Sequence, residues 1–315
     1  MPNEPAPRGS LSASAARNLA TATVTVPQML EITPRWLHKL LPWVDVDGGV
    51  YRVNRVARGA DGKESHAELL TSDSGEPKLP TTFVDYTEEP REYHLSTIQS
   101  VLHTHTRVTD LYSNRIDQLR EQVRLTVEAV KEREEWELIN HPKFGLFNEV
   151  APSQAIGARK GTPTPDDLDE LLSLVWKKPA FFLAHPKAIA AFGRECTRRG
   201  VPPPTVTILG SPFITWRGIP IVPSNKLEIN EAGKTSILLL RVGEAQQGVV
   251  GLQKAGVTGE VEPGLSVRYM GTNENSIAAH LVTRYFSAAV LTEDAIARLD
   301  NVSVGFYHEY VYPTA

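Results

Sequence analysis

The chain has 315 residues, with 33 lysines and arginines against 37 aspartates and glutamates, so its formal net charge is −4. This mildly acidic balance argues against nucleic acid as the main partner, because nucleic-acid-binding proteins carry clustered positive charge. The single cysteine, Cys196, excludes an intrachain disulfide bond and is typical of a reducing compartment. Neither a signal peptide nor an apolar run of membrane-spanning length is visible, so we expect a soluble, cytoplasmic protein.

The N-terminal region, up to about Thr25, is rich in alanine, serine, threonine and proline, which predicts a flexible or extended arm. A short helix is expected from Pro34 to about Leu41. Thr33 is the predicted N-cap residue of this helix, and Pro34 suits its first position.

Alternating apolar and polar residues predict a strand from Val50 to Val56, and a second strand is expected from Thr81 to Tyr86. The residues between them are rich in glycine, aspartate, serine and glutamate, which predicts a protruding loop from Ala57 to Pro80. Two strands with aromatic residues behind a long polar tip are typical of an arm that grips a neighbouring molecule. A plain surface hairpin is the alternative.

A long amphipathic helix is predicted from Asn114 to Asn140, because apolar residues recur there at steps of three and four. The apolar stripe consists of Ile116, Leu119, Val123, Val127 and Val130. At 1.5 Å per residue the helix would be roughly 40 Å long. The charged run Lys131–Glu135 is interpreted as a solvated face of this helix with local ion pairs.

Helices and strands are mixed in the rest of the chain. Thr164 and Pro165 start one helix, and Pro186 starts another that ends near Gly200. Strands are expected at 180–184, 213–216, 219–223, 236–242, 248–252 and 266–270, followed by a mixed strand and helix segment at 277–299. This order indicates an α+β fold without regular βαβ repeats.

The sequence contains no phosphate-binding loop, dinucleotide fingerprint, nucleophile elbow or paired-histidine zinc helix. His103 and His105 would share a face in a strand and could bind a metal there, but no cysteine or carboxylate partner is nearby. Cys196 lies among arginines that would lower the pKa of an exposed thiol, whereas a buried structural cysteine is the commoner case.

Four acidic residues cluster at the start of the predicted helix after Thr164. They are Asp166, Asp167, Asp169 and Glu170. Negative charge is favoured in a first helical turn by the helix dipole, so we interpret the cluster as a solvated helix start and not as an acid–base pair.

Seven segments together carry a resemblance to a known family. They are Ile32–Trp36, Gly49–Arg55, Asp110–Ser113, Thr164–Leu168, Ala191–Glu195, Gly200–Pro204 and Phe213–Pro220. In this order, over nearly the whole chain from about Ala16 to Tyr310, they closely resemble the family 2A encapsulin shell protein. None of them is a catalytic motif, so the specificity of the resemblance lies in their number and spacing.

The resemblance implies a tailed-phage major-capsid fold of the Hong Kong 97 type and self-assembly into a closed icosahedral shell of sixty subunits. Residues 1–44 would then form an N-terminal arm and helix, and 45–94 an extended loop that clasps the neighbouring subunit. Residues 95–179 would form the peripheral domain with its spine helix, 180–271 the axial domain, and 272–315 the return to the peripheral domain and the C-terminal tail.

In shells of this family the reaction belongs to the enclosed enzyme. The resemblance implies a cysteine desulfurase cargo docked on the inner wall, with pyridoxal phosphate in that enzyme, and a role in sulfur metabolism or storage. The shell itself is expected to have no catalytic residue, cofactor or metal. Small solutes would enter through narrow pores, for which the turn at Arg217 and Gly218 is the candidate rim and Pro202–Pro204 the competing loop. The alternative interpretation is that both segments are ordinary surface turns.

Three other interpretations stay open. A prophage major capsid protein would share the fold. A standalone enzyme would lose activity on mutation of Cys196 or His103, and a membrane-associated protein would float with liposomes.

Overall fold

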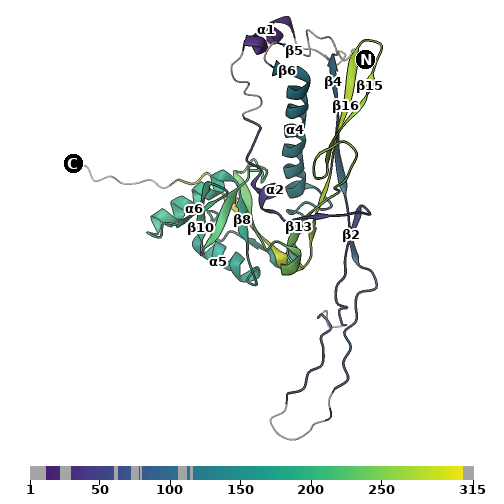
Figure 1. Cartoon of the computed structure of the whole chain (residues 1–315). Helices are drawn as coiled ribbons and strands as arrows, with labels where there is room; N and C mark the ends of the chain where they lie inside the picture. The colour runs from purple at the N-terminus through teal and green to yellow at the C-terminus, as the bar shows by residue number, and fades with distance from the viewer. Residues whose placement is uncertain are drawn as a thin grey trace, which may run out of the picture.

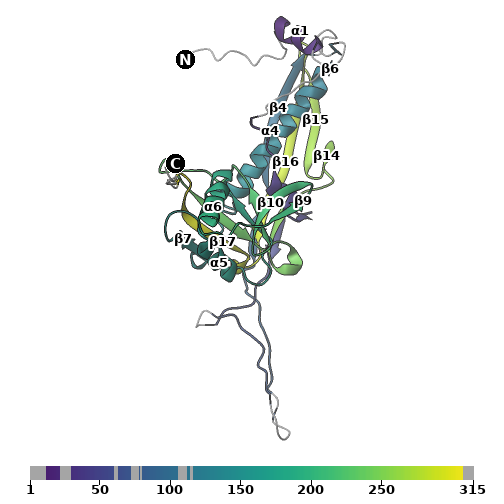
Figure 2. The same ribbon diagram turned by 90° about the vertical axis from the view of Figure 1, so that its left-hand side faces the viewer.

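The computed structural model describes residues 12–21, 30–59, 63–71, 78, 80–105, 112–113 and 116–307. Figure 1 shows a body with a seven-stranded sheet, an elongated part in which a long helix runs beside a six-stranded sheet, and a loop that protrudes from the junction of the two. The view in Figure 2 places the long helix in front of the strands. Along the described chain, no helix is both long enough and apolar enough to cross a membrane.

The N-terminal region contains two helices, α1 (Ala13–Thr21) and α2 (Trp36–Leu40). Helix α1 lies where composition predicted an arm without regular structure, while residues 1–11 and 22–29 of that arm lie outside the described residues. Helix α2 was predicted, but its N-cap residue is Arg35, with φ of 49°, and its cap has no side-chain hydrogen bond. Thr33 was therefore the wrong cap, because its hydroxyl binds Glu132 instead.

The six-stranded sheet is built on β16 (Ile277–Val290), which pairs with three other strands. The other members are β1 (Trp43–Asp45), β4 (Ser96–His105), β13 (Val249–Gln253), β14 (Glu260–Glu262) and β15 (Leu265–Thr272). The order is β1-β13-β16-β15-β14. Strands β4 and β13 share one edge of β16: β4 pairs with residues 277–286 and β13 with residues 286–290. No strand was expected in the stretch that forms β4.

The long helix is α4 (Gln118–Asn140), whose 23 residues span roughly 35 Å. Its existence is confirmed, but it begins four residues later than predicted. Ile116, from the predicted apolar stripe, lies in the short strand β6 (Ile116–Asp117), which pairs with β5 (Tyr112–Ser113). The side chain of Asp117 caps the helix by accepting a hydrogen bond from the backbone N–H of Arg120, at 3.1 Å. Val127 and Val130 pack on the six-stranded sheet.

The seven-stranded sheet has the order β7-β17-β12-β8-β11-β10-β9. These strands are β7 (Ala155–Gly157), β8 (Phe181–Ala184), β9 (Thr205–Ile208), β10 (Ser211–Trp216), β11 (Ile219–Pro223), β12 (Lys234–Leu240) and β17 (Ile296–Ser303). Two predicted helices pack against it, α5 (Pro165–Leu174) and α6 (Pro186–Arg198), and they bury Leu168 and Phe192 in its core. The start of α5 forms the predicted cap, with Thr164 and Asp167 bonding each other's backbone N–H.

The C-terminal segment differs from its prediction. A mixed strand and helix segment was predicted at 277–299, but the described residues there form no α-helix, and only a 3-10 turn, Glu293–Ala295, lies between β16 and β17. Residues 296–303 extend because β12 and β7 bind them on both sides. Two further 3-10 turns, Pro152–Gln154 and Glu244–Gln246, complete the described elements.

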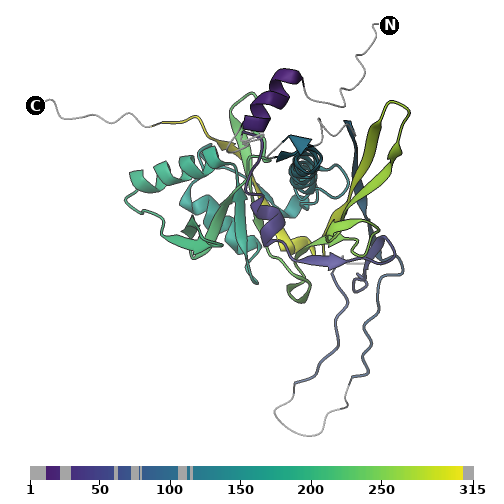
Figure 3. The same cartoon turned by 45° about the horizontal axis from the view of Figure 1, so that its top comes forward.

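The protruding loop begins and ends in a two-stranded sheet of β2 (Val50–Val53) and β3 (Arg91–His94). Beyond it, the strand expected at Thr81–Tyr86 forms only a single bridge, between Val56 and Tyr86. Figure 3 shows the loop pointing away from the rest of the molecule. The arm-like protrusion is therefore confirmed, whereas its second strand is not formed in the single chain.

Candidate functional site

The acidic side of α4 holds the segment that leads into α2. The carboxylate of Glu132 accepts hydrogen bonds from the backbone N–H of Thr33 at 2.8 Å, from Arg35 at 3.1 Å and from Lys226 at 2.7 Å. Burial works to raise the pKa of Glu132, but the hydrogen bonds from Lys226 and Thr33 outweigh it and lower the pKa. One carboxylate thus joins the N-terminal segment, the long helix and the loop after β11.

The same helix also carries one side of a buried ion pair, which joins it to β16. Glu134 accepts from Arg284 of β16 through Nε at 2.9 Å and Nη2 at 2.7 Å, and both side chains are buried. His38 lies against this pair, with its Nε2 3.6 Å from the Glu134 carboxylate. Burial and then the charge of Arg284 lower the pKa of His38 to about 4, so this imidazole is neutral near pH 7.

Glu135 completes the contact by accepting the backbone N–H of Leu37 at 3.0 Å. Burial raises the pKa of Glu135 to about 7. The solvated face predicted for Lys131–Glu135 was therefore wrong for Glu134 and Glu135. No local signal reveals these contacts, since Arg284 lies 150 residues away in the chain.

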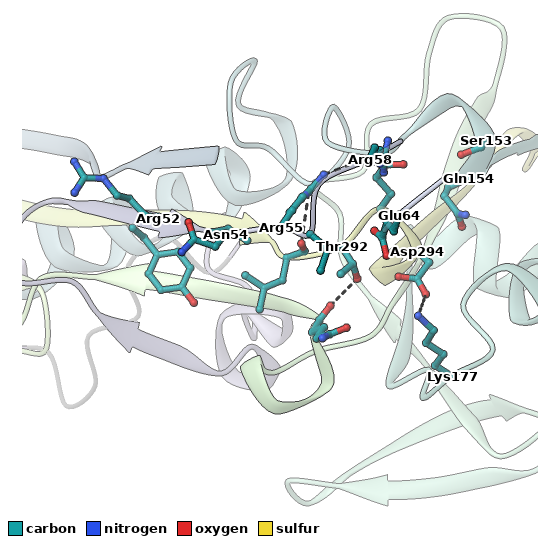
Figure 4. Close-up of a pocket in the computed structure, with 16 residues that line it drawn as sticks. Arg52, Asn54, Arg55, Arg58, Glu64, Ser153, Gln154, Lys177, Thr292 and Asp294 are labelled. Atoms are coloured by element: carbon teal, nitrogen blue, oxygen red, sulfur yellow. Dashed lines mark hydrogen bonds and ion pairs between the residues drawn. The ribbon is translucent and has the colours of Figure 1, made fainter. Parts of the chain in front are cut away.

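A polar cavity of about 590 Å³ lies where the protruding loop joins the body, and Figure 4 shows its lining. One residue of β2 and two that follow it attach the loop to the body at this cavity. Tyr51 donates to Glu244 at 2.6 Å, Arg58 donates to Glu293 at 3.0 Å, and Arg55 lies 3.5 Å from the same Glu293 carboxylate. Burial and the hydrogen bond to Glu244 raise the pKa of Tyr51 to about 12.

Thr292 and Asp294 line this cavity, and the almost completely buried Arg241 donates to Asp294 at 2.7 Å and to Thr292 at 2.8 Å. Asp294 also pairs with the partly exposed Lys177 at 2.8 Å. Burial works to raise the pKa of Asp294, but the hydrogen bonds from Arg241, Lys177 and Thr292 hold the pKa well below its usual range. The root of the loop therefore rests on a charged network that is fixed in the body.

The predicted pore-rim residues form the tight turn between β10 and β11. Arg217 and Gly218 have φ of 50° and 82°, the two positive values that a type I′ hairpin turn requires. The guanidinium of Arg217 donates to Asp169 at 2.9 Å and lies over the ring of Trp216. The turn is exposed, and its place at a pore remains a prediction.

The acidic cluster at the start of α5 is solvated only in part. Asp167 is buried in the helix cap, so the predicted solvation was wrong there. The other three carboxylates bind cations near the surface: Asp166 pairs with Arg199, Asp169 with Arg217, and Glu170 with Arg159.

The remaining candidates for chemistry are two histidines of one strand and the buried Cys196. His103 and His105 do lie in a strand, β4. Among the residues that the structure describes, no group of three or more histidine, cysteine, aspartate or glutamate side chains is placed to hold a metal ion. Cys196 is buried on α6, and burial raises the pKa of its thiol to about 11, which is the opposite of an activated cysteine.

Comparison with known proteins gives the family. Residues 53–306 match the family model described as type 2A encapsulin shell protein, SrpI-like. The chain is 59% identical over 307 residues to the type 2A encapsulin shell protein SrpI of Synechococcus elongatus, covering 98% of both proteins. It is 56% identical over 297 residues to a type 2A encapsulin shell protein of Mycolicibacterium paratuberculosis, covering 94% of this chain and 95% of that one.

Solved structures with a similar fold include an encapsulin and a phage protein. The cryo-EM structure of the holo-SrpI encapsulin complex from Synechococcus elongatus has a TM-score of 0.82 at 57% identity, covering 96% of this chain and all of that one. A protein of Microbacterium phage Oxtober96 has a TM-score of 0.61 at 14% identity, covering 93% of this chain and 99% of that one. The second likeness concerns the fold alone, and together they confirm the predicted tailed-phage capsid fold.

Proposed function

Because the chain belongs to the type 2A encapsulin shell protein family, we propose that it assembles into a closed icosahedral shell of sixty copies in the cytoplasm, with an enzyme enclosed. The alternative of a prophage capsid protein is disfavoured, because the likeness to phage proteins is confined to the fold. The protein has a structural role, and we propose that the shell itself catalyses no reaction.

The protruding loop is the observation that carries the proposal. Leu69 and Phe83 are 88% and 84% exposed on it. Large apolar side chains on an arm of this length have no core of their own, and such exposure marks a protein–protein contact. The contacts of Tyr51 and Arg58 at the cavity fix the direction in which the loop leaves the body. A fixed direction lets identical contacts repeat around symmetry axes, as a closed shell requires.

The polar contacts that join the N-terminal segment, α4 and β16 support the same proposal. Glu132, Glu134 and Glu135 tie these three elements together through contacts that are largely shielded from solvent. Shell curvature depends on the angle between the two parts of each subunit. A junction with several specific polar contacts holds that angle more closely than apolar packing alone.

We propose a cysteine desulfurase as the enclosed enzyme, with pyridoxal phosphate as that enzyme's cofactor, and a role in sulfur metabolism or storage. This part of the proposal rests on the family. We also propose that the turn at Arg217 and Gly218 lines a pore, since it is an exposed hairpin tip that carries a guanidinium paired with Asp169. An Arg217→Glu shell with unchanged entry of small anions would contradict this assignment.

Purification of particles from the native host tests the cargo. We expect a second protein to coelute with the particles, to show the visible absorbance of bound pyridoxal phosphate, and to release sulfide from cysteine in the presence of a reductant. Particles that contain only the shell chain, or a second protein without that cofactor, would contradict the desulfurase assignment while leaving the shell proposal intact.

A further inference from the structure

Three carboxylates of α4 bind the segment that leads into α2, and only two cations contact them. Arg35 pairs with Glu128 at 2.6 Å and with Glu132 at 3.1 Å, and Lys226 pairs with Glu132 at 2.7 Å. Among the described residues, the third carboxylate, Glu135, has no ion pair. The paired side chains are at most 18% exposed, and Glu135 is 2% exposed. With every carboxyl group ionised, this shielded cluster would carry one uncompensated negative charge.

Glu135 is the carboxyl group of this cluster that is best placed to hold a proton. It accepts a hydrogen bond from the backbone N–H of Leu37, which is uncharged. Burial raises the pKa of Glu135 to about 7, and the neighbouring charge of Glu132 adds to the rise. A neutral Glu135 leaves two carboxylates facing two cations. The charge balance of the contacts and the burial of the side chain therefore assign the proton to the same residue.

The other charged groups around this part of α4 form balanced ion pairs. These pairs are Glu134 with Arg284 of β16 and Lys131 with Glu262 of β14. On α2, His38 has a pKa of about 4 because of its burial and the charge of Arg284, so it is neutral from pH 5 to pH 8. Loss of the Glu135 proton therefore changes the net charge of this junction by one full unit, with no cation in contact to balance it.

Helix α2, which lies beside one end of α4 in Figure 1, is the covering element that can move. It has five residues, its N-cap residue Arg35 has φ of 49°, and no side chain caps it. A helix this short has no stability of its own. In contrast, α4 has 23 residues and a side-chain cap at Asp117. Leu37 is completely buried in the main core, so movements of α2 that bring water to Glu135 are rare in the neutral state.

We propose that residues 33–41, here called the latch, open from α4 more often when the Glu135 carboxyl group has lost its proton. In the open state this carboxyl group is solvated and ionises as an ordinary glutamate does, whereas the closed state keeps the proton. Because the two pKa values are 4.5 and about 7, openings become more frequent as the pH rises between them and level off above 7. The chain thus holds its N-terminal attachment at acidic pH and loosens it at neutral and alkaline pH. The inference concerns a single chain and does not depend on the proposed shell.

Hydrogen exchange of the full-length chain at pH 5 and pH 8, followed by peptide mass spectrometry, tests the latch. After correction for the intrinsic pH dependence of exchange, we expect the amides of residues 37–41 to exchange at least about tenfold faster at pH 8. Helix α5 (Pro165–Leu174), which packs on the seven-stranded sheet, is the control segment and should change less than about threefold. Sedimentation at both pH values verifies that the assembly state is the same. Equal corrected rates in the latch, or an equal increase in α5, would overturn the proposal.

A Glu135→Gln variant identifies the group that carries the effect. Glutamine cannot ionise and keeps an acceptor for the N–H of Leu37, so its latch should exchange at the same corrected rate at pH 5 and pH 8. Glu121→Gln, the matched control on α4, should keep the tenfold change of the unaltered chain. A tenfold change that persists in Glu135→Gln would overturn the proposal, because another group would then carry it. Both comparisons apply to particles and to dissociated subunits alike, so they stand or fall separately from the shell proposal.

Discussion

The guanidinium of Arg284 and the carboxylate of Glu134 form an ion pair at 2.7 Å, with side-chain exposures of only 4% and 1%. The pair joins β16 to the long helix α4, and His38 from α2 lies beside it. Two charges removed from water are stabilised only by their mutual contact and by the hydrogen bonds around them. The pair is therefore a sensitive reporter of the junction between sheet, helix and N-terminal segment.

Replacing Glu134 by glutamine should lower the free energy of unfolding by about 3–5 kcal/mol, because Arg284 would stay buried without a counter-charge. Urea denaturation of dissociated subunits, followed by tryptophan fluorescence, measures the loss. The double variant Glu134→Leu with Arg284→Met removes both charges and should regain most of the stability. A double variant as unstable as the single one would contradict this account of the pair.

Glu135 should make stability depend on pH near neutrality. Its pKa is raised from 4.5 to about 7 in the folded state, so between pH 4.5 and 7 the folded chain holds a proton that the unfolded chain has released. The contribution of this proton to the stability of the fold is complete below pH 4.5 and is lost as the pH rises through 7. Glu135→Gln cannot titrate and keeps an acceptor for Leu37, so at pH 8 it should be more stable than the unaltered chain by about 1–3 kcal/mol.

At pH 5 the same substitution should have little effect. Glu121→Gln is the matched control on α4, since Glu121 pairs only with its neighbour Arg124 among the ion pairs of the described chain. Its effect should stay within about 1 kcal/mol at both pH values. A Glu135→Gln effect that is the same at pH 5 and pH 8 would show that Glu135 does not titrate in this range.

Asp294 should be the critical carboxylate of the cavity at the loop root. Asp294→Asn leaves the buried Arg241 without its counter-charge and should cost about 3–5 kcal/mol, whereas Lys177→Met removes the half-exposed partner and should cost less than about 1 kcal/mol. Because the pKa of Asp294 is lowered from 3.8, its contribution is present above pH 3.8 and is lost as the pH falls below it. Equal losses for the two variants, measured at pH 7, would contradict the network.

Cys196 should be inert in the folded chain. With a pKa of about 11, only on the order of a thousandth of the thiol is ionised at pH 8, and the side chain is buried. An aromatic disulfide reagent should modify it only after denaturation, as release of the coloured thiolate reports. Rapid modification of the native protein would reopen the interpretation of the chain as an enzyme.

The parts of the fold that sequence alone predicted are those whose causes are local. Thr164, Pro165 and Asp167 start α5 with contacts three residues apart, and they were read correctly as a helix start. The 3.6-residue period of α4 likewise depends on the helix itself. The fold class came from the resemblance, since no local pattern distinguishes a capsid fold from other α+β arrangements.

The parts that were missed have causes far away in the chain. Thr33 does not cap α2 because its hydroxyl and backbone N–H donate to the carboxylate of Glu132, 99 residues later in the chain. Residues 296–303 are a strand because β12 and β7 flank them. The strand expected at Thr81–Tyr86 has a different cause of failure. Its end is bridged to Val56 through Tyr86, but a strand needs a neighbouring strand along its whole length, and Thr81–Val84 have none among the described residues.

Negative-stain electron microscopy of the purified chain, expressed without any cargo and taken from the void fraction of a sizing column, is the decisive measurement of shell assembly. We expect uniform, closed, roughly spherical particles made of this chain alone. Monomers, small oligomers or open sheets under the same conditions would contradict self-assembly into a shell.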